Sequence, residues 1–386
     1  MGKFYDIIIC GGGASGMLLT RELISRNLSH LSILVIEKES KNSNDRTWCF
    51  WDKEDRYFDH LLSNTFTHFE FYSKKSNLHF DLTPYRYKML RSESFYKYIH
   101  QLIDESPNIS WIHADIQSIK EVADHVEVNT EEGQYYGKWV FKSFPEKNWQ
   151  SKPQLQVAQH FKGWFIETRN PAFNEKSAIF MDFRIPQCEE IRFFYVLPLS
   201  NNQALVEIAI FSGEPLKSEE YDPLIKDYIT QYLQIDQYQI TEEEVGIIPM
   251  TTYPFWKHNS PRIIHIGTGG GAVKPSSGYA FKRMLEHASL IAQSIESRSF
   301  AGKPDSFFLN KYYFYDRTLL DVFLKQSRSG EVIFDILFSK NKIMKVLSFL
   351  DGTTTLGEEI SIFSSLPFLP FAKGFSRQVW QYYRGN

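Results

Sequence analysis

The N-terminal part of the chain contains three stretches with distinct hydrophobic patterns. Residues 6–10 are dominated by apolar side chains, as is typical of a buried parallel strand. Residues 15–27 have the apolar spacing of a helix, and residues 31–36 form a second apolar run. The pattern therefore predicts a strand–helix–strand unit over residues 4–37.

A glycine motif joins the first predicted strand to the helix. Gly11, Gly13 and Gly16 fill a G-x-G-x-x-G pattern. The first glycine allows a tight turn, the second lets backbone N–H groups approach a pyrophosphate, and the third lets the helix lie close to the sheet. Ala14 and Ser15 open the helix, whose positive end would face the phosphates. We expect a dinucleotide at this motif; the alternative is an ordinary glycine-rich turn.

Further cofactor-binding candidates follow the motif. Glu37 ends the second apolar run about 20 residues after the last glycine, where an acid is expected to bind ribose hydroxyls. In an FAD protein the next loop passes near the cofactor, so Arg46 could pair with a phosphate or the pyrimidine, and Trp48 could form a wall beside the flavin. The alternative is a loop packed on the sheet. Arg91 could meet anions of the cofactor or substrate, or it could be a solvated charge.

The region up to residue 141 mixes strand and helix patterns. Residues 66–72 and 78–82 alternate between apolar and polar, which predicts a hairpin inserted in the nucleotide fold. Ser92 is a predicted N-cap for the helix that follows. Three more strands are predicted at residues 109–114, 126–129 and 135–141.

The pattern changes after a polar crossover at residues 144–153. Strand-like segments separated by turn residues then predict a mostly antiparallel sheet of the kind that roofs a flavin site. These segments are residues 159–167, 177–184, 191–197 and 203–211, with a helix at 221–233.

A second glycine-rich segment follows a predicted strand at residues 261–266, and a helix is expected at 279–296. A second segment of this kind is useful to an FAD protein, because its loop approaches the ribityl chain and the flavin ring. The alternative is a purely structural turn. The candidate cofactor-binding residues here are Gly267, Gly269, Gly270, Gly271, Pro275 and Gly278.

These elements predict an α/β protein with a two-dinucleotide-binding-domain FAD fold. A Rossmann-like parallel sheet would be built from residues 1–143 and 246–300, and an antiparallel β substrate domain from residues 144–245 would be inserted in it. Residues 301–386 would form a helical C-terminal region.

Composition excludes several classes of protein. The chain has 386 residues and a net charge of −3, so nothing indicates nucleic-acid binding. Cys10, Cys49 and Cys188 form no C-x-x-C pair, which argues against a disulfide framework or a zinc site and fits a reducing cytoplasm. The histidines show no metal-ligand spacing, and we expect no metal. The first strand leaves no room for a signal peptide, and no apolar run has the length of a membrane span.

One acidic residue interrupts an otherwise apolar strand. Glu207 lies in residues 204–211, where both faces of the strand are apolar apart from this carboxyl. Burial would favour the protonated carboxyl and could make it a general acid at neutral pH. Alternatively, it reaches a buried arginine or a backbone amide. Asp182 and Arg184 share one strand face and could brace a nearby acid or form a plain surface ion pair.

The motifs together resemble those of bacterial FAD-dependent lycopene cyclases of the carotenoid β-cyclase type. The matching stretches run in order across nearly the whole chain. They are residues 5–16, 46–51, 87–95, 180–184, 195–198, 205–207, 246–250, 267–279 and 349–351.

The resemblance implies a flavoprotein that closes the ends of lycopene into β-ionone rings without net redox change, as an isomerase or intramolecular lyase. It implies reduced FAD as cofactor, with NAD(P)H as reductant, and an essential glutamate at Glu207. The family often has a second acid directly after this glutamate, where this chain has Ile208, so one buried acid is expected. The family's usual acid after the Trp-Val-Phe run is Lys142 here.

The expected substrate dissolves in membranes, although the chain has no predicted span. We therefore expect a cytoplasmic protein that is peripheral on the inner face of the cell membrane. The candidate docking surface is residues 360–375, with Lys373 inside it and Arg377 just after; the alternative is a C-terminal tail packed on the core. Two rival functions remain: an FAD-dependent monooxygenase or reductase acting on an apolar isoprenoid, and a flavin-binding carotenoid carrier.

Overall fold

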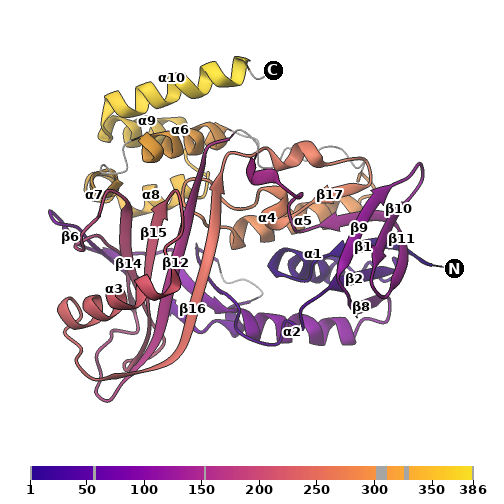
Figure 1. The fold of residues 1–386 in the computed structure, drawn as a ribbon, viewed down its shortest axis with the longest axis horizontal. Coiled ribbons are helices and arrows are strands. Elements are labelled where there is room, and N and C mark those ends of the chain that lie inside the picture. The colour runs from indigo at the N-terminus through magenta and orange to yellow at the C-terminus, as the bar shows by residue number, and fades with distance from the viewer. Residues whose placement is uncertain (1, 55–57, 152–153, 301–310, 326–329, 385–386) are drawn as a thin grey trace.

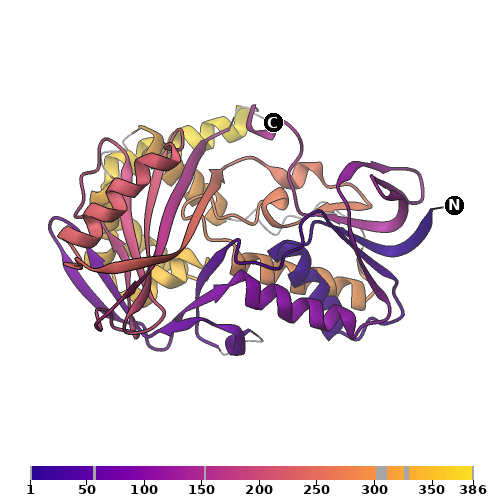
Figure 2. The same cartoon turned by 60° about the horizontal axis from the view of Figure 1, so that its bottom comes forward.

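The computed structural model contains two large β-sheets side by side, with a group of helices from the end of the chain beside them (Figure 1). A small third sheet joins the two large ones, and Figure 2 shows the two large sheets on opposite sides of the molecule. The residues described are 2–54, 58–151, 154–300, 311–325 and 330–384.

The first sheet has the order β8-β2-β1-β11-β10-β9, with β17 also paired to β11. Residues 7–10 of β1 are fully buried because parallel neighbours flank this strand and both faces of the sheet are covered. The strands are β1 (Lys3–Cys10), β2 (Ile33–Glu37), β8 (Ile109–His113), β9 (Ile116–Glu121), β10 (Val126–Thr130), β11 (Gly133–Lys142) and β17 (Ile263–His265).

Three helices cover one face of this sheet. Their apolar sides share a core with β1 and β2, and α1 packs along α5. The helices are α1 (Ala14–Ser25), α2 (Ser92–Asp104) and α5 (Phe281–Glu296). The predicted strand–helix–strand unit is thereby confirmed. Two details differ: β9 was not predicted, and Ser92 is the first residue of α2 and not its N-cap.

The second sheet has the order β16-β12-β15-β14-β13-β5-β6 and is antiparallel except where β5 meets β13. One face is covered by α3 (Ser218–Gln231), and the other faces the C-terminal helices and the small sheet. The strands are β5 (His68–Tyr72), β6 (Asn77–Asp81), β12 (Gln156–Thr168), β13 (Ser177–Asp182), β14 (Ile191–Pro198), β15 (Gln203–Ser212) and β16 (Tyr238–Thr251).

The predicted hairpin at residues 66–82 forms as β5 and β6, but it extends the second sheet and not the nucleotide fold. Its placement was therefore predicted wrongly. The reason is packing: Phe69 stacks on Phe180 of β13 with ring centroids 4.2 Å apart, and this contact draws the hairpin to a strand more than a hundred residues away. In addition, the boundary predicted at residue 246 falls inside the continuous strand β16.

The small sheet, in the order β3-β7-β4, leads from the first sheet to the second. Its strands are β3 (Thr47–Asp52), β4 (Asn64–Phe66) and β7 (Arg86–Arg91), and short helical turns lie at η1 (Asp59–Leu61), η2 (Trp149–Ser151) and η3 (Phe255–His258). Because β3 follows the loop after β2, it carries the Trp48 side chain to the space between the large sheets.

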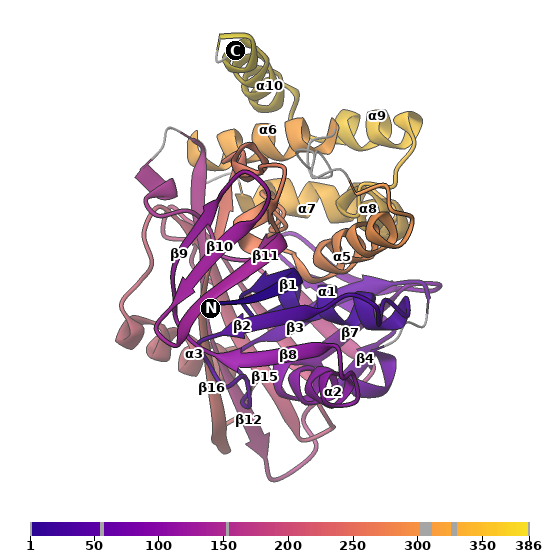
Figure 3. The same cartoon turned by 90° about the vertical axis from the view of Figure 1, so that its right-hand side faces the viewer.

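The end of the chain is helical, as predicted, although residues 301–310 and 326–329 of that region lie outside the described residues. In Figure 3, α10 lies outermost. None of the described helices combines the length and the apolar character needed to cross a membrane. These helices are α6 (Lys311–Lys325), α7 (Gly330–Lys340), α8 (Ile343–Leu350), α9 (Leu356–Ser365) and α10 (Phe368–Arg384).

Candidate active site

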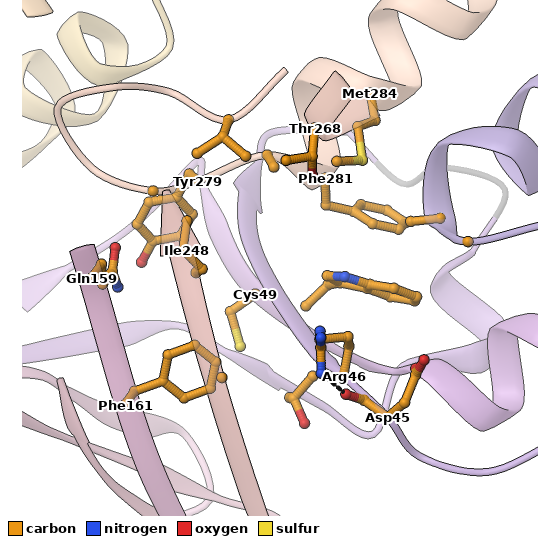
Figure 4. A pocket seen from close by; sticks show the side chains of 18 of the residues that line it. Asp45, Arg46, Cys49, Gln159, Phe161, Ile248, Thr268, Tyr279, Phe281 and Met284 are labelled. Atoms are coloured by element: carbon orange, nitrogen blue, oxygen red, sulfur yellow. Dashed lines mark hydrogen bonds between the residues drawn. The ribbon is translucent and has the colours of Figure 1, made fainter. Parts of the chain in front are cut away.

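A cavity of about 400 Å³ lies between the two large sheets. In Figure 4, Gln159 and Phe161 of β12 project into it from one side, and Phe281 and Met284 of α5 line another part of it. Its wall brings together these candidate residues from distant parts of the chain: Gly13, Ala14, Ser15, Arg46, Trp48, Glu207, Gly267 and Gly278.

The first glycine motif has the close contacts that its pattern predicts. Gly11 has φ +102°, and a Cβ on Gly16 would lie 2.0 Å from the Gly11 carbonyl oxygen. At Gly13, in contrast, a Cβ would meet no described atom within 4 Å. The first turn of α1 contains no acidic residue. The positive end of this 12-residue helix therefore borders the cavity and suits a phosphate.

Glu37 is held beside this motif at the end of β2. One carboxylate oxygen accepts the Gly12 N–H at 2.6 Å, and the other accepts the Glu39 N–H at 2.9 Å. The carboxylate is therefore fixed next to the glycine turn, although it does not form part of the cavity wall.

The second glycine segment folds differently from the prediction. A four-residue helix, α4 (Gly267–Gly270), follows β17, and a loop then leads to α5, which begins at Phe281 and not at residue 279. Gly267 has φ +59°, and a Cβ there would lie 2.8 Å from the Cβ of Ser15. The two glycine segments therefore touch each other and border the same cavity.

The rest of this segment serves packing more than the cavity. A Cβ on Gly269 would lie 2.5 Å from the backbone of Phe144, and one on Gly270 would lie 2.3 Å from the His265 carbonyl oxygen. Gly271 and Pro275 line a smaller neighbouring cavity.

Trp48 forms part of an aromatic wall. Its ring stacks on Phe281 with centroids 5.2 Å apart and an interplanar angle of 28°, while the edges of Phe95 and Tyr96 meet it on other sides. Arg46 is exposed, borders the cavity and donates a hydrogen bond to the Asp45 carbonyl oxygen (Figure 4). Both positions are compatible with the predicted cofactor contacts.

Gln159 provides a further polar group that sequence reasoning missed. Its Oε1 atom is buried without a hydrogen-bond partner and would lie 2.1 Å from a Cβ placed on Gly278. An unpaired buried acceptor against the second glycine segment suits a ligand that carries N–H or O–H donors. The isoalloxazine ring of a flavin has such a donor, so the described residues fit this group.

Arg91 lies away from the cavity wall. Its guanidinium pairs with Glu242 at 2.5 Å and stacks over the Phe165 ring at 4.1 Å. The structure gives it a bridging position between β7 and β16, and its predicted contact with the cofactor has no support here.

Asp182 and Arg184 also lie away from the cavity wall. Asp182 is fully buried and forms a two-pronged ion pair with Arg184, and the Tyr228 hydroxyl of α3 donates a third hydrogen bond at 2.7 Å. The pairing is confirmed, but these groups tie β13 to α3 and do not brace Glu207. Their predicted catalytic roles have no support in this geometry.

The replacement Asp182→Ala tests the structural role of this ion pair. It leaves the Arg184 guanidinium and the Tyr228 hydroxyl without their acceptor, and we expect a loss of about 2–3 kcal/mol in the free energy of unfolding. Urea denaturation measures this loss. Glu190→Ala removes a carboxylate that is 25% exposed, against 0% for Asp182, from its pair with Arg192, and should cost less than about 1 kcal/mol. Equal losses would contradict the assignment.

Glu207 is the acidic residue that borders the cavity on β15. Its strand neighbours on the same face are Leu205 and Ala209, which belong to the apolar core. Within the described residues its carboxyl has no hydrogen-bond or ion-pair partner. The alternative expectation, a contact between Glu207 and a buried arginine or a backbone amide, is therefore not found there. Burial, and secondarily the charge of Glu244, raises the pKa of Glu207 well above its ordinary value. The group is therefore a neutral acid.

Three tyrosines that the sequence analysis did not select surround this region. The hydroxyls of Tyr87 and Tyr279 are 3.0 Å apart, and Tyr195 pairs directly with Glu207 across the β14–β15 ladder. Burial raises the pKa of all three phenols, so they remain uncharged aromatic groups around the cavity.

Comparison with known proteins identifies the family of the chain. A family described as "Lycopene cyclase protein" matches residues 6–375, nearly the whole chain. The chain belongs to the lycopene cyclase family. A lycopene beta-cyclase from Pseudescherichia vulneris is 24% identical over 304 residues, which covers 75% of this chain and 74% of that protein. The family and this relative support an enzyme that acts on carotenoids.

Solved structures of flavin proteins share the fold. A flavin-dependent brominase has a TM-score of 0.62 at 12% identity and covers all of both chains. Aklavinone-11 hydroxylase, solved with FAD and aklavinone, has a TM-score of 0.63 at 12% identity over 86% of this chain and 71% of its own. The lycopene cyclase fold found here is therefore the Rossmann-type fold of FAD-dependent enzymes, as predicted.

Two other positions near the site have structural explanations. His265 on β17 is buried, and its ring contacts Glu146 and Asn259, so it is a satisfied core residue. Lys142, at the family's usual acid position, pairs with Glu146 at 2.6 Å. Within the described part of the chain, no three potential ligand side chains are grouped so that they could hold a metal ion.

Proposed function

We propose that this protein is a lycopene β-cyclase, an isomerase that closes the ends of lycopene into β-ionone rings with reduced FAD bound. One observation carries the proposal: the Glu207 carboxyl, whose pKa burial raises, has no hydrogen-bond partner among the described residues and borders the same cavity as both glycine segments. A neutral acid in an apolar wall suits a reaction that begins with protonation of an alkene.

The proposed reaction conserves atoms and electrons. Glu207 donates its proton to the terminal double bond of the polyene, which produces a tertiary cation. The neighbouring double bond attacks this cation and forms the ring bond, and the charge moves to the adjoining carbon. Loss of a proton then forms the ring double bond, and the Glu207 carboxylate accepts that proton.

The wall of the cavity contributes to the same chemistry. The aromatic faces of Tyr87, Tyr195 and Tyr279 stabilise a cation without forming a bond to it. The apolar surroundings of Glu207 exclude water, which would otherwise trap the cation. Reduced FAD, with electrons from NAD(P)H, supplies negative charge beside the cation when it is bound; the glycine segments, Trp48 and Gln159 would hold it.

Two other functions are compatible with the fold and are less favoured. A monooxygenase or reductase acting on an apolar isoprenoid, the first alternative, does not need an isolated neutral acid in the wall. A carotenoid carrier has no turnover to lose when that acid is removed. The mass of the product distinguishes the cyclase from the monooxygenase or reductase, because cyclisation leaves the mass of lycopene unchanged.

The first test is expression in lycopene-producing cells, followed by chromatography and mass measurement of the pigments. The intact chain should form cyclic carotene of unchanged mass. Glu207→Gln removes the proton donor and should lower cyclisation at least about 100-fold, while the purified variant keeps its flavin absorbance.

The matched control is Glu243→Gln. The Glu243 side chain pairs with Lys162 and is half-exposed, so this variant should cyclise like the intact chain. Full turnover by Glu207→Gln would refute the acid assignment, and a product of altered mass would favour the monooxygenase or reductase.

We also propose that α9 and α10 dock on the inner face of the cytoplasmic membrane, from which the substrate would enter. Leu356, Ile360 and Phe363 recur on one side of α9 and are exposed. Phe368 and Leu369, at the start of α10, are 78% and 66% exposed. An amphipathic surface of this kind supports peripheral binding.

Nearby cations contribute to this surface to different degrees. Lys373 is exposed on α10, where it could meet anionic lipid head groups. Arg377, in contrast, is engaged in an ion pair with Asp321. The apolar residues should therefore account for most of the binding.

The double replacement Phe368→Ser and Leu369→Ser tests this proposal. It removes apolar area from the surface and should lower binding to anionic phospholipid vesicles several-fold in a flotation assay. Leu290→Ser changes an apolar residue on α5 that is 48% exposed and lies outside the proposed surface, and it should leave binding unchanged. Equal binding by all three proteins would place the docking surface elsewhere.

A further inference from the structure

Four residues form one row across the second sheet. Tyr195 of β14 pairs with Glu207 of β15, Glu207 pairs with Gly163 of β12, and Gly163 pairs with Glu244 of β16. Residues paired in this way point to the same face of a sheet. Two glutamates therefore lie on the cavity side of the sheet with only a glycine between them.

The glycine leaves room for Glu207 to extend toward β16. A Cβ on Gly163 would lie 3.1 Å from the Cβ of Glu207 and 3.4 Å from its Cγ. It would also lie 2.6 Å from a methyl carbon of Leu205. The Glu207 side chain thus lies over Gly163, in the direction of the strand that carries Glu244.

Glu244 differs from Glu207 in its hydrogen bonds. One carboxylate oxygen accepts the Thr47 backbone N–H at 2.9 Å, and the other accepts the Thr47 hydroxyl at 2.6 Å. Glu244 is buried and also borders the cavity. Both oxygens of the Glu244 carboxylate therefore have a donor, whereas the Glu207 carboxyl has none among the residues that the structure describes.

We propose that Glu244 is a positioning residue for the acid step: its carboxylate, held by the two donors of Thr47, keeps the proton on Glu207 across the gap left by Gly163. This inference rests on the proposed cyclase function and deepens it. The expectation of a single buried acid, which followed from Ile208, is therefore incomplete, because the second carboxylate comes from another strand.

The other polar groups close to Glu207 are uncharged, so Glu244 is its charged neighbour. Cys49 of β3, Tyr87 of β7, Tyr195 of β14 and Tyr279 before α5 border the same cavity, and burial keeps the thiol and the phenols in their neutral forms.

Two cations also border the cavity, and each has a partner from its own loop. Lys41 pairs with Glu39 and Asp45, and Arg46 donates to the Asp45 carbonyl oxygen. Asp45 borders the cavity as well but pairs with Lys41, so Glu244 is the carboxylate that lies next to Glu207 in the sheet.

The test is an infrared titration of the purified protein without substrate. The carbonyl band of protonated Glu207 is identified by its loss in Glu207→Gln. In Glu244→Gln a negative charge is absent, so Glu207 should lose its proton at a lower pH than in the intact protein. Glu244→Asp keeps the charge, so the pH at which Glu207 loses its proton should return toward that of the intact protein.

The activity profile provides a second readout. Cyclisation needs protonated Glu207, so kcat/KM should persist below its pKa and fall above it. This alkaline limb should shift to lower pH in Glu244→Gln. It should stay in place in Glu243→Gln, because the Glu243 carboxyl of the intact protein pairs with Lys162.

Superimposable titrations of the intact protein and Glu244→Gln would overturn the inference. Failure of the proposed function would look different: the intact protein would form no cyclic product, whatever the infrared band does.

Discussion

The desolvation of one carboxyl group is the constraint around which the site is built. An ionised Glu207 in the apolar face of β15 would lose hydration without gaining a hydrogen-bond donor from the described residues, and burial therefore raises its pKa. The fold maintains this state through the register of four strands, because a shift of one residue would turn the carboxyl toward α3. The protonation of Glu207 therefore depends on the strand register of the second sheet.

The sequence was sufficient to predict features that depend on local pattern. The glycine motif, the buried strand before it and the isolated acid at Glu207 are each readable from a few neighbouring residues, and they agree with the structure. Features that depend on pairing between distant segments were not predictable in this way. The hairpin at residues 66–82 has the right local form, but only its aromatic contact with β13 determines which sheet it joins.

The same distinction explains the site residues. Arg91, Asp182 and Arg184 carry charges that look chemically useful. The carboxylate that pairs with Arg91 comes from β16, however, and the hydroxyl that joins the Asp182–Arg184 pair comes from α3, and no local pattern reveals either partner. Conversely, Glu244 lies in an acidic run that resembles a solvated surface. It lies next to the site because Gly163 of β12 is the one residue between Glu244 and Glu207 in the sheet.

The position of β16 at the edge of its sheet has a consequence for the behaviour of the protein at high concentration. Among the described residues this strand pairs only with β12, and Val245 and Ile247 are exposed along it, so its outer edge could pair with a strand of another molecule. Glu242 and Glu243 are charged side chains on this edge strand, and charges at an edge disfavour such pairing, whereas Glu244 beside them is buried. The strand that brings Glu244 to the cavity thus also carries charges that disfavour association of the protein through this edge.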